Sequence, residues 1–314
     1  MTTMDVMSPR VERVRAFFAP VDRVAKTPAV FDPAQRGSFD LDAPPSPWID
    51  LGWVRGFARS CSTKVDAIKT GAPLTTAMQV RSEVEATVRF SFESWGKLQL
   101  ALSAGTQQMN LLRAASAVAM QRTGGAAVAA TALDATSTAT SLVLAGTSAD
   151  GFSAGDLVAV DVDYAGATGY VGAGMNGAYL TTALTDVDYV RRVTLNVARV
   201  ASVVGNVLTL ETALPAGAPT AEMKASAVVG FCDREGSSFF QQWSAVFVAE
   251  GQQGERVVWH YPRLEAMSGV AEEASEDAGG FHALRLAAAF RALPAKDELD
   301  NETAVCWRSY VRSA

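Results

Sequence analysis

The sequence predicts a mainly β (α+β) fold, and three observations support this class. Residues 80–93 alternate between two kinds of side chain without a break, which is the spacing of a β-strand with one buried and one wet face. Residues 189–215 and 241–267 each contain two strand-like runs around a turn with glycine. Residues 121–230 are dominated by Ala, Gly, Thr and Val and lack helix signals.

The first 50 residues predict an extended arm. They contain seven prolines, which exclude most regular structure. The exception that we expect is a short amphipathic helix from Pro9 to Phe18, with one apolar side formed by Val11, Val14, Phe17 and Phe18. The arm would lie along a surface of its own subunit or of a neighbour. After it we expect a first strand over 51–62 and a long connection over 63–79.

Residues 80–93 predict a strand that is too long for a small core alone. At about 3.4 Å per residue it would span roughly 48 Å, whereas strands usually have about 5–6 residues. We therefore expect its sheet to extend past its own subunit, with a charged face toward water. The apolar face carries Val80, Ser82, Val84, Ala86, Val88, Phe90 and Phe92, and the wet face carries Arg81, Glu83, Glu85, Thr87, Arg89, Ser91 and Glu93.

One helix is predicted directly after this strand, with Ser94 as its N-cap. Gly105 would interrupt this helix. Its buried side would be shared by Trp95, Leu98, Leu102, Met109 and Leu112.

Residues 121–230 predict a small β-barrel or sandwich inserted into the main domain. A strand is expected within 151–164, after a Gly-Asp turn, and a hairpin is expected at Gly205-Asn206. The glycine-rich run 164–179 is expected to be a loop, because no helix follows it as a dinucleotide-binding fingerprint would require.

The pattern of the first half returns after residue 230. We expect a hairpin over 241–267, an acidic loop over 268–282, a strand over 281–294 with a helix as the competing prediction, and a closing strand over 303–311. The predicted domains are the arm at 1–50, a main β domain from 51–120 and 231–314, and the insert at 121–230.

Composition narrows the function classes. The net charge of −6 and the pI near 5.1 argue against a surface that binds nucleic acid. Cys61, Cys232 and Cys306 lack CxxC spacing, so we expect three small core residues in a reducing compartment. No segment has the length and apolarity of a membrane span.

The search for catalytic or metal-binding residues finds little. His260 lies on a predicted strand, and both it and His282 are expected to be packed or surface residues. The three cysteines and His260 lack the ligand spacing of a zinc site. Glu83 and Glu85 would lie about 7 Å apart on one strand face, near the separation of glycosidase carboxylates. Because arginines alternate with them, a solvated stripe is the favoured interpretation, and we expect no enzyme activity, cofactor or metal.

Two stretches resemble the bacteriophage tail tube (major tail) protein family. The first is WIDLGWVRGFARSCSTKVDAIKTGAP followed by VRSEVEATVRFSFESWGKLQLALSAGTQQMNLL, and the second comprises GERVVWHYPRLEA and LRLAAAFRALPAKDELDNETAVCWRSYV. Together they cover about residues 48–120 and 235–312, and the insert departs from a minimal tube subunit. The resemblance implies a tail-tube-like β-sandwich or barrel with a flanking helix.

The resemblance also implies a structural role in the virion. Six subunits would form a ring, rings would stack into a hollow tail, and long hairpin strands would join around each ring into one barrel. DNA would pass through that channel in transit, and the other partners would be further tail proteins: tape measure, terminator, and baseplate or tip. Subunits would assemble in the host bacterial cytoplasm, with no membrane partner.

Site residues follow from that implication. The candidate lumen-lining residues are Arg81, Glu83, Glu85, Thr87, Arg89, Ser91 and Glu93, whose charges sum to −1, so we expect them not to grip phosphate. The same residues would be a plain solubility stripe if that face points outward. The candidate core or interface anchors are Trp53, Trp95, Trp243, Trp259 and Trp307.

Two alternatives belong to other classes. The chain could be a glycan- or surface-binding β module, adhesin-like, with the insert 121–230 as the binding part. It could also be a hydrolase that uses Glu83 and Glu85. The tube interpretation predicts rings or filaments of purified protein, whereas the first alternative predicts a monomer or small oligomer with saccharide affinity.

Overall fold

The computed structural model describes residues 11–21, 27–32, 40, 44–45, 47–105, 109–112, 130–162, 196–233, 242–251, 254–267, 271–276, 282–297 and 299–311. The chain divides into two compact units. The first unit comprises Met1–Val21, Pro28–Ser94 and Gln242–Ala314, and the second comprises Asp22–Thr27 and Trp95–Gln241. The prediction of a mainly β fold is confirmed.

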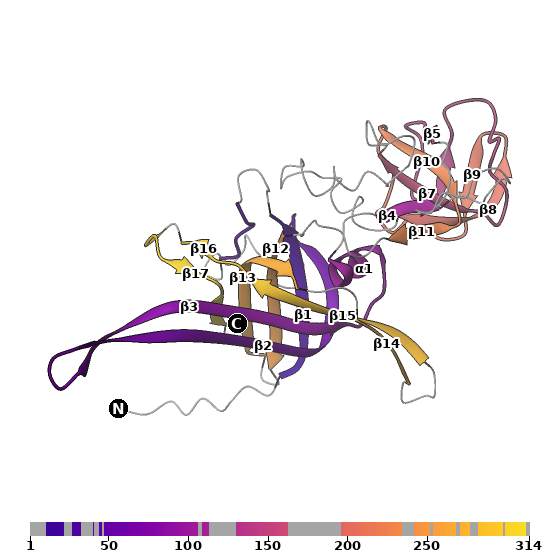
Figure 1. The fold of residues 1–314 in the computed structure, drawn as a ribbon. Helices are drawn as coiled ribbons and strands as arrows, with labels where there is room; N and C mark the ends of the chain where they lie inside the picture. The colour runs from indigo at the N-terminus through magenta and orange to yellow at the C-terminus, as the bar shows by residue number, and fades with distance from the viewer. Residues whose placement is uncertain are drawn as a thin grey trace, which may run out of the picture. The chain divides into compact units, whose positions relative to one another are not determined.

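The first unit is built on an eight-stranded antiparallel sheet that closes on itself. The strand order is β14-β15-β3-β2-β1-β12-β13-β18, and an additional pairing of β13 with β15 closes a barrel of six of these strands (Figure 1). The bounds are β1 Val11–Pro20, β2 Ile49–Thr70, β3 Thr75–Phe92, β12 Gln242–Gly251, β13 Arg256–Ala266, β14 Ala271–Glu276, β15 His282–Ala292 and β18 Trp307–Val311. A short ribbon of β16 (Ala295–Lys296) and β17 (Thr303–Ala304) precedes β18.

Aromatic side chains fill the interior of this barrel. Phe18 of β1 lies within 5.6–6.2 Å, between ring centroids, of Phe90, Phe247 and Phe290, which come from three other strands. All four rings are almost fully buried. Strand β1 is paired with β12 but not with β3 or β15, so the rings of Phe90 and Phe290 reach Phe18 across the interior, and such aromatic pairs add to the burial energy.

A second apolar layer covers part of the outer surface of the barrel. Phe17 and Val246 point away from the interior and are covered by Ala29, Phe31 and Trp48 from the proline-rich N-terminal region. The β1 strand is thus buried on both faces near its end. This explains why the spacing of Val14, Phe17 and Phe18 imitated a helix in the sequence.

The second unit contains the helix and a smaller sheet. The helix α1 (Lys97–Ala104) is followed by β4 (Met109–Leu112), which pairs with β11 (Gly230–Asp233). The sheet has the order β5-β10-β7-β8-β9-β6, and a bridge between Leu133 and Leu144 joins its two ends. Its strands are β5 Thr131–Ala132, β6 Ser141–Val143, β7 Leu157–Val162, β8 Val197–Val204, β9 Val207–Leu210 and β10 Met223–Val228.

The core of the smaller sheet is aliphatic. It contains Leu142, Val158, Val160, Val200 and Leu208, all fully excluded from solvent. The hairpin predicted at Gly205-Asn206 and the strand predicted within 151–164 are confirmed. The glycine-rich run 164–179 lies outside the described residues.

Several local predictions for the N-terminal half are wrong. The residues expected to form a helix from Pro9 to Phe18 belong instead to the strand β1. The connection expected over 63–79 consists mostly of strand, because β2 continues to Thr70 and β3 begins at Thr75. The second error arose because the Gly-Ala-Pro turn at 71–73 was taken to mark a long connection, whereas it is the tip of the β2–β3 hairpin.

The helix is shorter than predicted and has another cap. It begins after Gly96 and ends at Gly105, whose φ of 66° is the left-handed conformation that glycine adopts readily. Ser94 does not cap it, since its hydroxyl donates to the carbonyl oxygen of Leu51 at 3.2 Å. Met109 and Leu112, expected on the buried helix face, belong to strand β4.

In the C-terminal half, the hairpin around Gly251–Gly254 and the strand over 281–294 are confirmed. The acidic loop predicted over 268–282 is wrong in part, because Ala271–Glu276 pairs with β15 as a strand. The predicted insert 121–230 falls inside the second unit, whose limits at Trp95 and Gln241 are wider. The predicted arm contributes β1 to the middle of the first unit's sheet.

Candidate functional site

The most distinctive feature of the first unit is a hairpin that leaves the barrel. Strands β2 and β3 have 22 and 18 residues and stay paired up to Thr70 and Thr75. Every residue from Ser60 to Glu85 is exposed. Beyond the pair Cys61–Ala86 the ribbon runs on for about 30 Å at the usual rise per residue, and Figure 1 shows β2 and β3 passing the other strands to a shared tip.

The hairpin displays apolar side chains to solvent. Ile68 and Met78 oppose each other across the two strands and are 49% and 59% exposed. The other large apolar residues exposed on it are Val65, Leu74, Val80 and Val84. A two-stranded ribbon in water is marginally stable at best, and the rest of the described chain leaves these side chains exposed to solvent.

The alternation expected for residues 80–93 is interrupted within the hairpin. Lys64 opposes Glu83, but the next residue Val65 opposes Arg81, so β3 carries one extra residue at Ser82. Directly opposed residues share a face of the ribbon, and neighbouring residues on β2 point to opposite faces. Arg81 therefore lies on the face opposite to Glu83.

The predicted lumen-lining residues thus fall into two groups. Arg81, Glu83 and Glu85 lie on the projecting hairpin, where both faces are exposed. The others lie within the barrel portion or just after it, on its outer surface: Thr87, Arg89, Ser91 and Glu93. In the barrel portion the alternation holds, with Ala86, Val88, Phe90 and Phe92 buried inside.

Ion pairs connect neighbouring strands across this outer surface. Arg55 of β2 pairs with Glu93, and Arg291 of β15 donates to Glu85 of β3 at 3.0 Å. The alternation of residues 80–93 predicted that the two glutamates share one face, but it did not predict their arginine partners. Those arginines come from other strands, and only the register of the sheet shows that they are neighbours.

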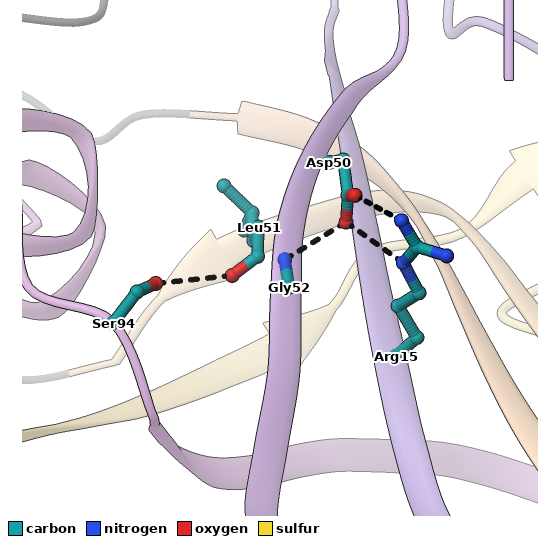
Figure 2. Close-up of polar contacts among 5 residues, drawn as sticks. All are labelled: Arg15, Asp50, Leu51, Gly52 and Ser94. Atoms are coloured by element: carbon teal, nitrogen blue, oxygen red, sulfur yellow. Dashed lines mark hydrogen bonds and ion pairs between the residues drawn. The ribbon is translucent and has the colours of Figure 1, made fainter. Parts of the chain in front are cut away.

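A third ion pair lies where β2 is distorted. Arg15 of β1 makes two hydrogen bonds to the carboxylate of Asp50, whose Oδ1 also accepts from the backbone N–H of Gly52 at 2.8 Å (Figure 2). Gly52 has a φ of 78°, and the β1–β2 register shifts here. The bulge lets Asp50 and Trp53 both face outward, and the guanidinium of Arg15 also lies 5.8 Å from the centroid of Trp53.

The register also reveals an arginine row on this surface, which we define as Arg55, Arg89 and Arg291. Arg55 opposes Ser91, which lies two residues from Arg89 on β3. Arg89 opposes Ala289, which lies two residues from Arg291 on β15. Each step therefore crosses one strand and moves two residues toward the hairpin, and such diagonal neighbours are about 7–8 Å apart.

The five tryptophans proposed as anchors differ in burial. Trp243 is fully buried, and Trp95 is about half exposed. Trp53, Trp259 and Trp307 are half-buried. Trp259 contacts Phe57 inside the barrel, with ring centroids 5.1 Å apart, and the indole N–H of Trp307 donates to Asp297 at 3.1 Å. These contacts are sufficient to account for Trp243, Trp259 and Trp307 as structural residues of the first unit.

The histidine on β13 is a buried structural group. The Nε2 atom of His260 lies 3.1 Å from the hydroxyl of Ser244, and that hydroxyl donates to the carbonyl oxygen of Ala29 at 2.6 Å. Burial lowers the pKa of His260 to about 4, which keeps the ring neutral at pH 7. Aromatic rings of Trp48 and Trp307 enclose it. The side chain of His282 lies outside the described residues.

A polar group closes one end of the barrel interior. The Nε of Arg59 donates to the hydroxyl of Tyr261 at 2.8 Å, and burial raises the pKa of Tyr261 to about 12.

Burial also raises the pKa of the Cys306 thiol. The prediction that the cysteines are core residues is wrong for Cys61, which is exposed at the base of the hairpin.

The described part of the chain contains no cluster of three or more side chains that could hold a metal ion. Its one described helix is too short to cross a membrane. Neither a scan against protein-family models nor a search of the curated proteins finds a match to this chain.

Proposed function

We propose that this protein is a structural subunit that assembles with copies of itself, as a bacteriophage tail tube protein does. In this proposal rings of subunits, six as the resemblance implies, stack into a hollow tail in the virion through which DNA passes. The observation that carries the proposal is the β2–β3 hairpin, which exposes six large apolar side chains on a ribbon that no described part of the chain covers.

The arrangement of the first unit supports head-to-tail contacts. The β2–β3 hairpin leaves the barrel beyond Ala86, whereas the β14–β15 hairpin leaves it at the other end of β3, beyond Ser91. The two ends of the barrel are therefore unlike. Unlike surfaces that meet give heterologous contacts, which close into rings or continue as filaments.

The hairpin is also suited to ring closure. Its outer edges carry unpaired backbone groups, and an exposed edge of this kind is an aggregation hazard unless another strand covers it. Pairing with the next copy around a ring would cover those edges and would bury Ile68 and Met78 together. The charged side chains near Glu83 and Glu85 would then remain in contact with water.

The test is negative-stain microscopy combined with sedimentation of the purified protein. Wild-type protein is expected to form rings or filaments, on its own or when seeded with preformed tails. Met78→Asp is expected to abolish assembly while leaving the thermal unfolding of the first unit unchanged, because Met78 contributes nothing to the barrel core.

The matched control is Gln79→Asp, which adds the same charge at the adjacent exposed position opposite Ala67. It is expected to assemble. Equal assembly of the two variants, or a wild-type monomer that seeding does not change, contradicts the proposal. A monomer whose 121–230 fragment binds saccharide would instead support the alternative of a glycan-binding module.

A further inference from the structure

We propose that the arginine row binds the phosphodiester backbone of double-stranded DNA. The inference deepens the proposed function, on which it rests, because it assigns to the outer barrel surface a contact that DNA in transit would make. It also revises the expectation, based on the charges of β3 alone, that this surface does not bind phosphate.

The charge of the surface depends on the neighbouring strands. The wet face of β3 was expected to carry a net charge of −1, with Arg81 included. The structure moves Arg81 to the other face of the ribbon and adds Arg55 and Arg291 beside Arg89. Within the arginine row three guanidinium groups meet two carboxylates, Glu85 and Glu93, which leaves one positive charge in excess.

The exposed ion pairs leave the arginines able to bind another anion. In the pair of Arg291 and Glu85 the side chains are 54% and 47% exposed. Exposed pairs of this kind contribute about 0.2–1 kcal/mol, so a phosphate can replace the carboxylate at small cost. Arg89 lies between the two pairs and is itself exposed.

Small side chains surround the row and keep the guanidinium groups accessible. Arg89 has Ala58 on one side and Ala289 on the other, while Ser91 and Thr87 are its neighbours on β3. The three arginines span about 15 Å along a diagonal. Guanidinium groups match phosphate oxygens with paired hydrogen bonds, and phosphates recur regularly along a DNA strand.

An acidic protein segment is the less suitable occupant. Protein interfaces are held mainly by apolar and aromatic anchors in a desolvated centre, and the immediate neighbours of Arg89 on both adjacent strands are alanines. A linear polyanion needs only regularly spaced positive charges. Because each subunit offers few of them, repeated copies would supply the affinity, and each single contact would exchange rapidly.

The experiment measures binding of short fluorescent duplex DNA to the purified protein in its assembled state, by co-sedimentation. Wild-type binding is expected to fall at least about tenfold between about 50 and 200 mM salt. Arg89→Gln is expected to weaken binding at the lower salt concentration at least about fivefold and to reduce the salt dependence.

Arg81→Gln is the matched control, since Arg81 is an exposed arginine on the same strand but on the other face. It is expected to change binding less than twofold. Microscopy and thermal unfolding of each variant report assembly and folding separately. Assembly without DNA binding would overturn this inference alone, whereas failure to assemble would count against the proposed function.

Two further outcomes would overturn the inference. One is an equal loss of binding in Arg81→Gln and Arg89→Gln, which would mean that the charge acts without regard to position. The other is competition by polyglutamate as effective as competition by unlabelled DNA of equal charge, which would identify an acidic peptide as the occupant.

Discussion

The two halves of β3 have similar sequences and opposite surroundings. From Ala86 to Phe92 the even residues are buried in the barrel, whereas from Thr75 to Glu85 every residue is exposed. Val88 is fully buried and Val84 is 48% exposed, although both are valines at even positions of one strand. The difference teaches that alternation specifies a strand and its two faces, but the strands that pack around it decide whether either face is buried.

The largest expected effect comes from placing the same charge in each half. Val88→Asp puts a carboxylate into the closed interior without a partner, and we expect the first unit not to fold. Val84→Asp should leave folding unchanged and should reduce assembly only. Circular dichroism and proteolysis of both variants check this, and a folded Val88→Asp protein would break the comparison.

A smaller effect is expected from removing one ring of the aromatic core. Phe90→Ala deletes a buried side chain that contacts Phe18, Phe247 and Phe290. Such substitutions cost about 3–5 kcal/mol. Chemical denaturation should show this loss in the first unit. The same measurement on Met78→Ala should show almost none, because Met78 lies on the exposed half.

Acid should destabilise the buried part of the first unit through His260. Its pKa is near 4 when folded and near 6.5 when unfolded, so the unfolded chain binds the proton first as the pH falls. The free energy of unfolding that the neutral, buried His260 contributes is fully present above pH 6.5. It is lost as the pH falls from about 6.5 to 4, and this loss amounts to about 3 kcal/mol.

Denaturation at several pH values, compared with His260→Gln, isolates this effect. The variant should lose the pH dependence that the wild type shows in this window, while the acid response of the carboxylates stays in both. Parallel curves for the two proteins would show that His260 is accessible to protons in the folded state.

The smallest effect is expected on the exposed surface. Glu85→Gln removes an ion pair with Arg291 between side chains that are about half exposed. The cost should be about 0.2–1 kcal/mol and should diminish as salt is added. A larger cost, measured by denaturation at low and high salt, would show that the outer surface contributes more to folding than its exposure indicates.

The strands that could be predicted from the sequence are those whose own residues, or the turns beside them, carry the signal. Alternation every two residues between turn signals predicted β13, β15 and the hairpin at Gly205-Asn206, and the glycine turn after β12 located that strand, although it is buried on both faces. Strand β1 was not predicted, because burial of Phe17 and Phe18 on opposite faces produces a spacing that suits a helix equally well. A strand buried on both faces carries apolar residues on both, so the alternation that marks a strand is lost.

The candidate site was predictable only in part, for a related reason. The sequence identified Glu85, Arg89 and Glu93 as one face of a long strand. It could not place Arg55 or Arg291 beside them, because that requires the register of three strands. It also could not show the extra residue at Ser82 that sends Arg81 to the other side.

The pairing of β4 with β11 bears on how this chain could have gained the smaller sheet of its second unit. The segment that leads into this sheet and the segment that returns from it are hydrogen-bonded neighbours, with Met109 opposite Asp233 and Leu112 opposite Gly230. A two-residue turn could join them directly. The residues between Leu112 and Gly230 could then be removed, or replaced by a segment of another length, through a change at one point of the gene. The remaining strands would keep their register.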